Sequence, residues 1–214
     1  MMLYNEWNGD IQSLIEDLSI RNARPNNFRI TALDIERLTD MLYAFYVAEV
    51  RNRNAGVEDE EAVRTNCRNV AKFLSDRERW KFGLVLSGAV GCGKTTMVYA
   101  MKEMIAWLTE SGKLSRCLVV RDAKEVAGEY DTLKDKPLLA VDDIGRESAE
   151  SMKYGNVFSP VADLLEYRYA KRLFTVLTTN LPTPRIGEIY GARVYDRCRE
   201  MFDVLTFKGK SYRG

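Results

Sequence analysis

The sequence of 214 residues contains no histidine and only four cysteines, Cys67, Cys92, Cys117 and Cys198, with no C-x-x-C spacing among them. A chain without histidine has no histidine general base, and it lacks the usual mixture of ligands for a zinc site. Scattered cysteines of this kind are typical of reduced thiols in a cytosolic protein and not of a disulfide framework. Zinc chemistry and histidine-based catalysis are therefore excluded.

Long apolar runs are also absent. No stretch reaches the ~18 apolar residues that a membrane-spanning helix needs, and the opening MMLYNEWNGD lacks the basic and apolar regions of a secretory signal. Basic residues number 32 and acidic residues 31, so there is no overall positive field that would attract nucleic acid. We expect a cytoplasmic protein without a membrane span, built as one α/β domain with a small helical addition.

The most informative stretch changes from strand type to helix type across a glycine-rich turn. The apolar run Phe82–Ser87 is followed by GAVGCGKTT, which fits the phosphate-loop pattern GxxxxGK[ST]. Glycines let backbone N–H groups face a polyphosphate, and a helix N-terminus adds partial positive charge. A turn that binds nothing is the less favoured alternative. We expect a nucleoside triphosphate to be held by residues of this turn, namely Gly88, Ala89, Val90, Gly91, Cys92, Gly93, Lys94, Thr95 and Thr96.

Two carboxylates follow a second apolar strand, in LLAVDDIG. The Lys94 ammonium is expected to reach the β- and γ-phosphates, and the Thr95 hydroxyl to be a ligand of Mg²⁺. Because that hydroxyl is a single ligand, the site needs an acidic partner, and Asp142 is placed to be the second, through a metal-bound water. Asp143 is expected to be the general base. Its side chain is shorter than that of glutamate, which predicts slow turnover. The alternative is two acids that begin a surface turn.

A third polar group ends the strand FTVLTTN. If this strand lies between the two that carry the motifs, then Thr179 or Asn180 faces the γ-phosphate and orients water. A simple turn after the strand is the competing interpretation.

The remaining pattern predicts helices first and then strands that alternate with helices. Thr31 and Asp34 resemble a capping box before the second helix, and the acidic run Glu58–Glu61 suits the start of the third. Alternation from Phe82 onward predicts a mostly parallel sheet covered on both faces. The expected helices are 11–20, 35 to about 54, 58–74, 95–109, 123–130, 157–172 and 193–202, and the expected strands are 82–87, 116–121, 137–141, 173–178 and 204–207.

Three arginines lie near the end of the sequence, in YGARVYDRCREM. Arg193 and Arg197 share a helix face at i, i+4, and arginine is suited to stabilising the charge of a transferring phosphoryl group. From spacing alone, the simpler interpretation is a helix surface on which the arginines pair with Asp196 and Glu200.

Taken in order, GAVGCGKTT, LLAVDDIG, the YGN at 154–156, LLEYRY, TTNL, YGARVYDRCREM and a terminal SYR resemble AAA+ ATPases of the DnaC/IstB group. These are bacterial helicase loaders and transposition helper ATPases. The resemblance covers about residues 65–214, and its most specific part is RVYDR followed by SYR.

The resemblance implies a three-layer P-loop NTPase of AAA+ type. Its five-stranded parallel sheet would have the order 5-1-4-3-2, with N-terminal helices and no C-terminal helical lid domain. It further implies that Arg197 acts as an arginine finger on a neighbouring subunit, with Arg193 beside it. Asn180 would be sensor 1 and Arg213 a sensor arginine. Residues 1–60 are expected to form a helical segment that either binds a partner or braces the ATPase domain, 61–214.

The functional hypothesis is an ATP-hydrolysing loader that self-assembles into a ring or filament on single-stranded DNA and loads a hexameric replicative helicase. One alternative is a transposition helper that recruits a transposase to DNA. Another is a nucleotide-gated adaptor with negligible hydrolysis. Candidate DNA contacts are the basic residues Arg168, Lys171, Arg172, Lys208 and Lys210.

Overall fold

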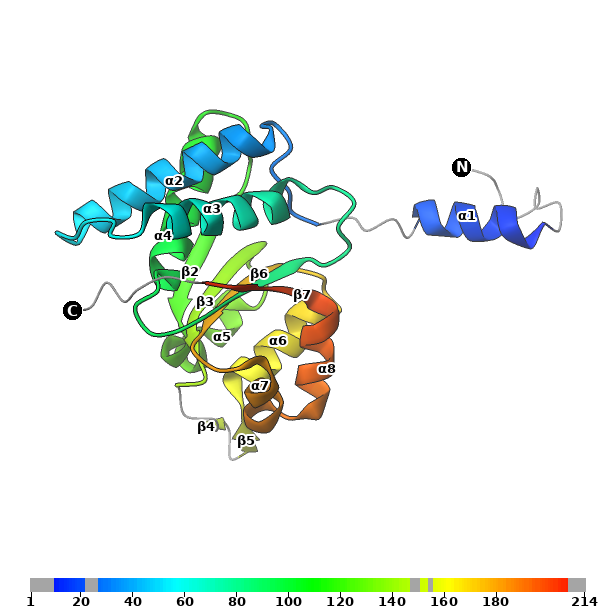
Figure 1. The fold of residues 1–214 in the computed structure, drawn as a ribbon. Coiled ribbons are helices and arrows are strands. Elements are labelled where there is room, and N and C mark those ends of the chain that lie inside the picture. The colour runs from blue at the N-terminus through cyan, green and yellow to red at the C-terminus, as the bar shows by residue number, and fades with distance from the viewer. Residues whose placement is uncertain (1–9, 22–26, 147–150, 154–155, 208–214) are drawn as a thin grey trace.

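The computed structural model describes residues 10–21, 27–146, 151–153 and 156–207 (Figure 1). The helices are α1 (Ile11–Arg21), α2 (Ile35–Asn52), α3 (Glu60–Ser75), α4 (Lys94–Glu110), α5 (Val126–Leu133), α6 (Pro160–Ala170), α7 (Thr183–Tyr190) and α8 (Ala192–Met201), with a 3-10 turn at Ala123–Glu125. The strands are β1 (Gly83–Ser87), β2 (Leu118–Asp122), β3 (Leu138–Ile144), β4 (Ser151–Lys153), β5 (Asn156–Phe158), β6 (Phe174–Thr179) and β7 (Phe202–Thr206).

Five strands form one sheet in the order β2-β3-β6-β1-β7, and every neighbouring pair is parallel. Numbered by their own sequence order, these strands read 2-3-4-1-5, which is the expected 5-1-4-3-2 seen from the other edge. The fold class is therefore confirmed. β4 and β5 form a separate antiparallel pair.

Helices cover both faces of the sheet because its strands are apolar on both sides. In β1, Leu84 and Leu86 belong to one buried cluster, together with side chains of α2, α3 and α4. Val85, between them, belongs to a second cluster with side chains of α5, α6, α7 and α8. The sheet thus lies between two helical layers, which Figure 1 shows above and below it.

The first layer includes helices that precede the phosphate-loop strand. α2 packs against both α3 and α4. Before α2, Arg29 donates hydrogen bonds to main-chain carbonyls of the segment that enters β1, among them those of Asp76 at 2.7 Å and Lys81 at 2.7 Å. α2 is therefore part of the helical layer that contains α4. α1 lies apart from this body in Figure 1. The expected division at residue 60 stays a prediction.

Several element boundaries differ from the expectation. Asp34 itself caps α2, since its side chain accepts a hydrogen bond from the Arg37 amide at 2.8 Å, so the expected capping box with Thr31 is wrong. α6 begins at Pro160 and not at residue 157, because residues 156–158 form β5. β7 begins at Phe202, which the sequence places in the preceding helix. α7 and the β4–β5 pair have no counterpart in the sequence expectation.

Arg168, an expected DNA contact, is fully buried in α6. Its guanidinium donates to the Thr175 hydroxyl and to four carbonyl oxygens, those of Leu133, Lys134, Lys136 and Phe174. Burial lowers the pKa of Arg168 to about 9, so the side chain stays protonated at neutral pH. It joins the end of α5 to β6, and the expectation that it contacts DNA is wrong.

No helix in the part of the chain that the structure describes is both long and apolar enough to cross a bilayer. Lys208, Lys210 and the terminal residues of the SYR motif lie outside the described residues, so the expected absence of a helical lid stays a prediction.

Candidate nucleotide-binding site

The carboxyl ends of β1, β3 and β6 meet at one edge of the sheet, where the three polar motifs come together. β6 lies between β1 and β3, as the interpretation of Asn180 requires. Ser87 at the end of β1 is level with Thr179 of β6. The register between β3 and β6 shifts between Val141 and Ile144, so Asp142 and Asp143 sit in an irregular strand end. Asp143 has a positive φ of 60°.

The turn after β1 relies on glycine where a side chain cannot fit. Gly93, immediately before α4, has a φ of 90°, and a Cβ added there would lie 2.0 Å from the Tyr46 hydroxyl of α2. At Gly88, with a φ of 153°, a Cβ would lie 2.7 Å from the Phe207 carbonyl oxygen. Both positions bring the main chain into contact with another segment, which only glycine permits.

Lys94 points back over this turn. Its ammonium donates hydrogen bonds to the carbonyl oxygens of Gly88 and Ala89, both at 2.8 Å, and to Asn180 Oδ1 at 2.7 Å. The side chain is 6% exposed and has no carboxylate among these partners. The charge is therefore held by neutral oxygens, and the oxygens of a polyphosphate can replace them without breaking an ion pair.

Thr95, Asp142 and Thr178 form a hydrogen-bonded group beside the turn. Thr95 Oγ1 lies 3.1 and 3.0 Å from the two carboxylate oxygens of Asp142. Thr178 Oγ1 donates to Asp142 Oδ1 at 2.5 Å and accepts from the Asp143 amide at 2.7 Å. A hydroxyl and a carboxylate in contact are the hard oxygen donors that Mg²⁺ takes, so these residues fit that ion.

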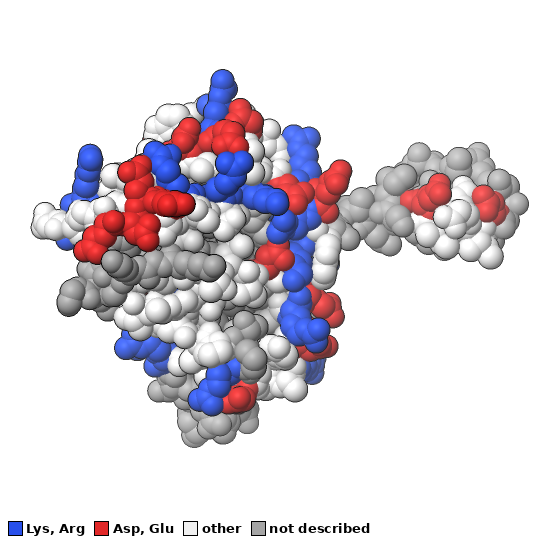
Figure 2. Space-filling view, viewed as in Figure 1, with Lys and Arg blue, Asp and Glu red and all other residues white. Residues whose placement is uncertain are grey.

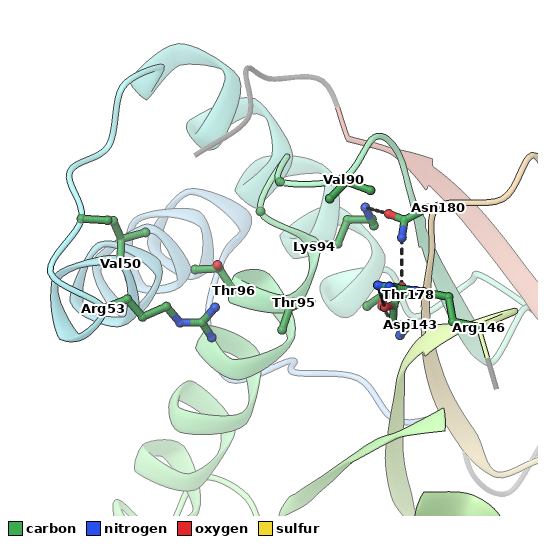
Figure 3. Close-up of a pocket in the computed structure, with 13 residues that line it drawn as sticks. Val50, Arg53, Val90, Lys94, Thr95, Thr96, Asp143, Arg146, Thr178 and Asn180 are labelled. Atoms are coloured by element: carbon green, nitrogen blue, oxygen red, sulfur yellow. Dashed lines mark hydrogen bonds and ion pairs between the residues drawn. The ribbon is translucent and has the colours of Figure 1, made fainter. Parts of the chain in front are cut away.

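Asp143 is engaged at both carboxylate oxygens. Oδ1 accepts from Asn180 Nδ2 at 2.9 Å, and Oδ2 accepts from Arg146 Nη1 at 2.8 Å. Asn180 therefore bridges Lys94 and Asp143, as Figure 3 shows. Thr179, the other candidate at the end of β6, is buried and donates to the Ile144 carbonyl instead.

A cavity of about 230 Å³ opens at this edge of the sheet. One wall is the expected one, formed by the phosphate-loop turn together with Asp143 and Asn180. The opposite wall comes from the end of α2 and the residues after it, Val50, Arg53 and Ala55. The sequence analysis predicts none of these residues, nor Arg146 and Thr178, as part of the site. No motif marks them, and the end of α2 reaches the site only through packing.

Arg193 and Arg197 are not among the residues that line the cavity. Both lie on α8, on the opposite side of the body in Figure 1 from the end of α2. They pair with Glu166 of α6, and not with Asp196 or Glu200 as the helical spacing suggests. Arg213 lies outside the described residues, as do Tyr154 and the glycine that follows it.

The strand order, the glycine turn and the acidic strand end together define a three-layer P-loop fold of AAA+ type. No model of a known protein family matches the chain, and no curated protein matches it in sequence.

Solved structures of the same fold do match. The structure of DnaI is 22% identical over 73% of this chain and 87% of its own, with a TM-score of 0.55. That of the DnaC helicase loader is 22% identical over 72% of this chain and 92% of its own, with a TM-score of 0.51. The fold implied by the sequence motifs is thus the fold found.

Proposed function

We propose that the protein binds ATP with Mg²⁺ in this cavity and hydrolyses it. The observation that carries the proposal is the position of Lys94, whose ammonium is held over the glycine turn by two carbonyl oxygens, Asn180 Oδ1 and the Cys92 sulfur. Such a cation, at the N-terminus of α4, has a defined place and no fixed counter-ion, which suits a polyphosphate.

The side chains at the strand ends would then have separate roles. Thr95 and Asp142 would hold Mg²⁺, which neutralises phosphate charge. Asp143 would accept the proton of the attacking water. Each of its oxygens already accepts one hydrogen bond, from Asn180 or Arg146, which fixes the carboxylate, and we expect hydrolysis to be slow in the isolated subunit. Asn180 would orient the water or the γ-phosphate.

We further propose a helicase-loader role, in which subunits assemble on single-stranded DNA and Arg197 reaches the nucleotide of a neighbour. Two features support this: the similarity of fold to the DnaC helicase loader, and the position of Arg197 outside its own cavity. α1, with Ile11 67% and Ile15 50% exposed, is the candidate segment for binding a replicative helicase or, in the alternative role, a transposase.

The proposed DNA contacts are basic residues close to an exposed aromatic side chain. Lys171 and Arg172 follow α6, and Arg172 lies next to Trp80, which is 45% exposed and could stack on a base. Figure 2 shows basic side chains gathered along the right side of the body with acidic ones among them, so this face has no uniformly positive groove.

One observation favours the gated adaptor as a second candidate. With both oxygens of Asp143 occupied, ATP could bind and change the conformation while hydrolysis stays negligible. Figure 3 shows Asp143 and Arg146 together below Asn180.

The test is steady-state ATP hydrolysis by the wild type and by Arg197→Ala, with and without single-stranded DNA, over a range of protein concentrations. A loader-type ATPase gives turnover that rises more than linearly with protein, increases with DNA and collapses in the variant. Turnover that rises only linearly with protein concentration, and that neither DNA nor the Arg197→Ala substitution changes, would contradict assembly and DNA binding. ATP binding without turnover would favour the adaptor.

A further inference from the structure

One carboxylate, that of Glu166, pairs with two of the three arginines of α8. Glu166 Oε1 lies 3.1 Å from Arg193 Nε, and Glu166 Oε2 lies 2.8 Å from Arg197 Nη1. The two cations differ in burial: the side chain of Arg193 is 74% exposed, whereas that of Arg197 is 26% exposed and that of Glu166 27%. Arg197 is therefore anchored, and Glu166 is its acidic partner from another helix.

The anchoring has a second component. The Arg197 guanidinium lies over the ring of Tyr169, 5.4 Å from the centroid, and the Tyr169 hydroxyl donates a hydrogen bond to Glu200. Tyr169 is on α6, less than one turn after Glu166, and Glu200 is on α8. Two residues of α6, Glu166 and Tyr169, thus contact the Arg197 guanidinium.

We propose that Glu166 is a positioning residue, which orients Arg197 for contact with the nucleotide of a neighbouring subunit. This inference rests on the proposed function, because it concerns the same trans-acting arginine. On this proposal, Glu166 holds the Arg197 side chain in its binding orientation before two subunits associate.

The chemistry of guanidinium allows Glu166 to remain bound while Arg197 acts. A guanidinium carries five N–H donors in a rigid plane, and the 2.8 Å contact with Glu166 is made by the Nη1 group of Arg197. Even a bidentate pair with one carboxylate occupies two of these donors. The other donors are left for phosphate oxygens. Holding the side chain in advance reduces the conformational entropy that the arginine loses when it binds phosphate.

Asp163 provides a matched control on the same helix. It lies less than one turn before Glu166, and its pKa is raised, first by burial and then by the charge of Glu166. No ion pair links it to either arginine among the described residues. Asp163→Asn and Glu166→Gln therefore remove the same charge from the same region, and only the second removes the contact with Arg197.

The experiment compares the full-length wild type with Glu166→Gln, Asp163→Asn and Arg197→Ala. ATP hydrolysis is measured at saturating protein and DNA, and ¹⁵N relaxation of the arginine Nε–H groups reports how well each side chain is ordered. We expect Glu166→Gln to lower kcat about tenfold with an unchanged KM, since a misplaced catalytic group costs rate and not binding. Relaxation should show greater mobility of Arg197. Asp163→Asn should stay within about twofold of the wild type on the same grounds.

The outcomes separate this inference from the proposed function. If Arg197→Ala abolishes turnover while Glu166→Gln does not lower kcat, the positioning role is overturned and the loader-type ATPase stands. Mobility of Arg197 without loss of kcat overturns it as well. If Arg197→Ala leaves turnover unchanged, or the wild type has none, the trans-acting arginine and the role of Glu166 fall together. Equal losses in Glu166→Gln and Asp163→Asn would show a charge effect and also overturn it.

Discussion

Lys94 and Arg168 are both buried cations whose partners are neutral oxygens, with 6% and 0% of their surfaces exposed. Lys94 has three such partners and lines a cavity. Arg168 has five partners, distributed over its whole guanidinium, and lies in the interior between α5 and β6. The two residues are similarly buried, but only Lys94 lies beside a cavity in which a ligand could replace its hydrogen-bond acceptors.

The difference separates a binding cation from a structural one. A phosphate can reach the Lys94 ammonium because Lys94 and its partner Asn180 both line an open cavity. The carbonyl oxygens around Arg168 end a helix and begin a strand, so losing the guanidinium would leave them buried without donors. A buried charge therefore does not by itself indicate a functional site. A functional cation also needs a cavity beside it that can admit a ligand.

The largest expected effect is on stability, in Arg168→Ala. Removing five hydrogen bonds from the interior should lower the free energy of unfolding by more than about 3 kcal/mol, measured by chemical denaturation. Lys171→Ala, which truncates an exposed side chain just after the same helix, should change it by less than about 0.5 kcal/mol. If Arg168→Ala is as stable as the wild type, Arg168 is not a structural cation and the proposed difference from Lys94 is wrong.

The second expected effect is on binding, in Lys94→Ala. ATP affinity should fall about 100-fold, equivalent to about 2.7 kcal/mol, while unfolding changes little. Equilibrium binding of a fluorescent ATP analogue measures this. Lys102→Ala is the control, since Lys102 is on the same helix but pairs with Glu103 at the surface. Equal affinities for the two variants would mean that Lys94 is a structural cation too.

A smaller effect is expected where α2 meets the phosphate-loop turn. Gly93→Ala combines a φ of 90° with a clash against the Tyr46 hydroxyl, whereas Gly112→Ala combines a φ of 71° with open space. We expect losses in stability of about 2 kcal/mol for the first and about 1 kcal/mol for the second. Adding Tyr46→Phe should recover part of the first loss. If thermal unfolding shows no recovery, the contact between α2 and the turn is not tight.

The smallest expected effect is on the pH dependence of stability, through the buried thiols of Cys67 and Cys198. Burial raises the pKa of Cys67 and of Cys198 to about 12, whereas Cys117 is exposed. At pH 8 a thiol reagent should modify Cys117 rapidly and the other two only on unfolding. Because the unfolded chain loses these protons first, the free energy of unfolding should fall as pH rises from 9.0 toward about 12. Rapid modification of Cys67 in the native protein would contradict its burial.

Local patterns were sufficient for much of the fold. The phosphate loop, the strand ending in Asp142 and Asp143, and the parallel sheet follow from apolar runs and glycine positions that neighbouring residues determine. Boundaries failed where the signal was weak: Asp34 replaced the expected Thr31 cap, and a short strand stands where α6 was expected to begin. The conformational propensity of individual residues does not determine where a short helix or strand begins when tertiary contacts stabilise it.

The sequence by itself determined which chemistry is available: a glycine turn with Lys94 and Thr95, two adjacent carboxylates, and arginines on a late helix. Only the tertiary structure decided which of these groups meet. Packing of α2 against α4 brought Val50 and Arg53 to the cavity, the sheet order put Asn180 between Lys94 and Asp143, and α6 gave Arg197 its partner Glu166. The physical reason is that backbone conformation follows local sequence, whereas side-chain partners distant in the chain depend on how the layers pack.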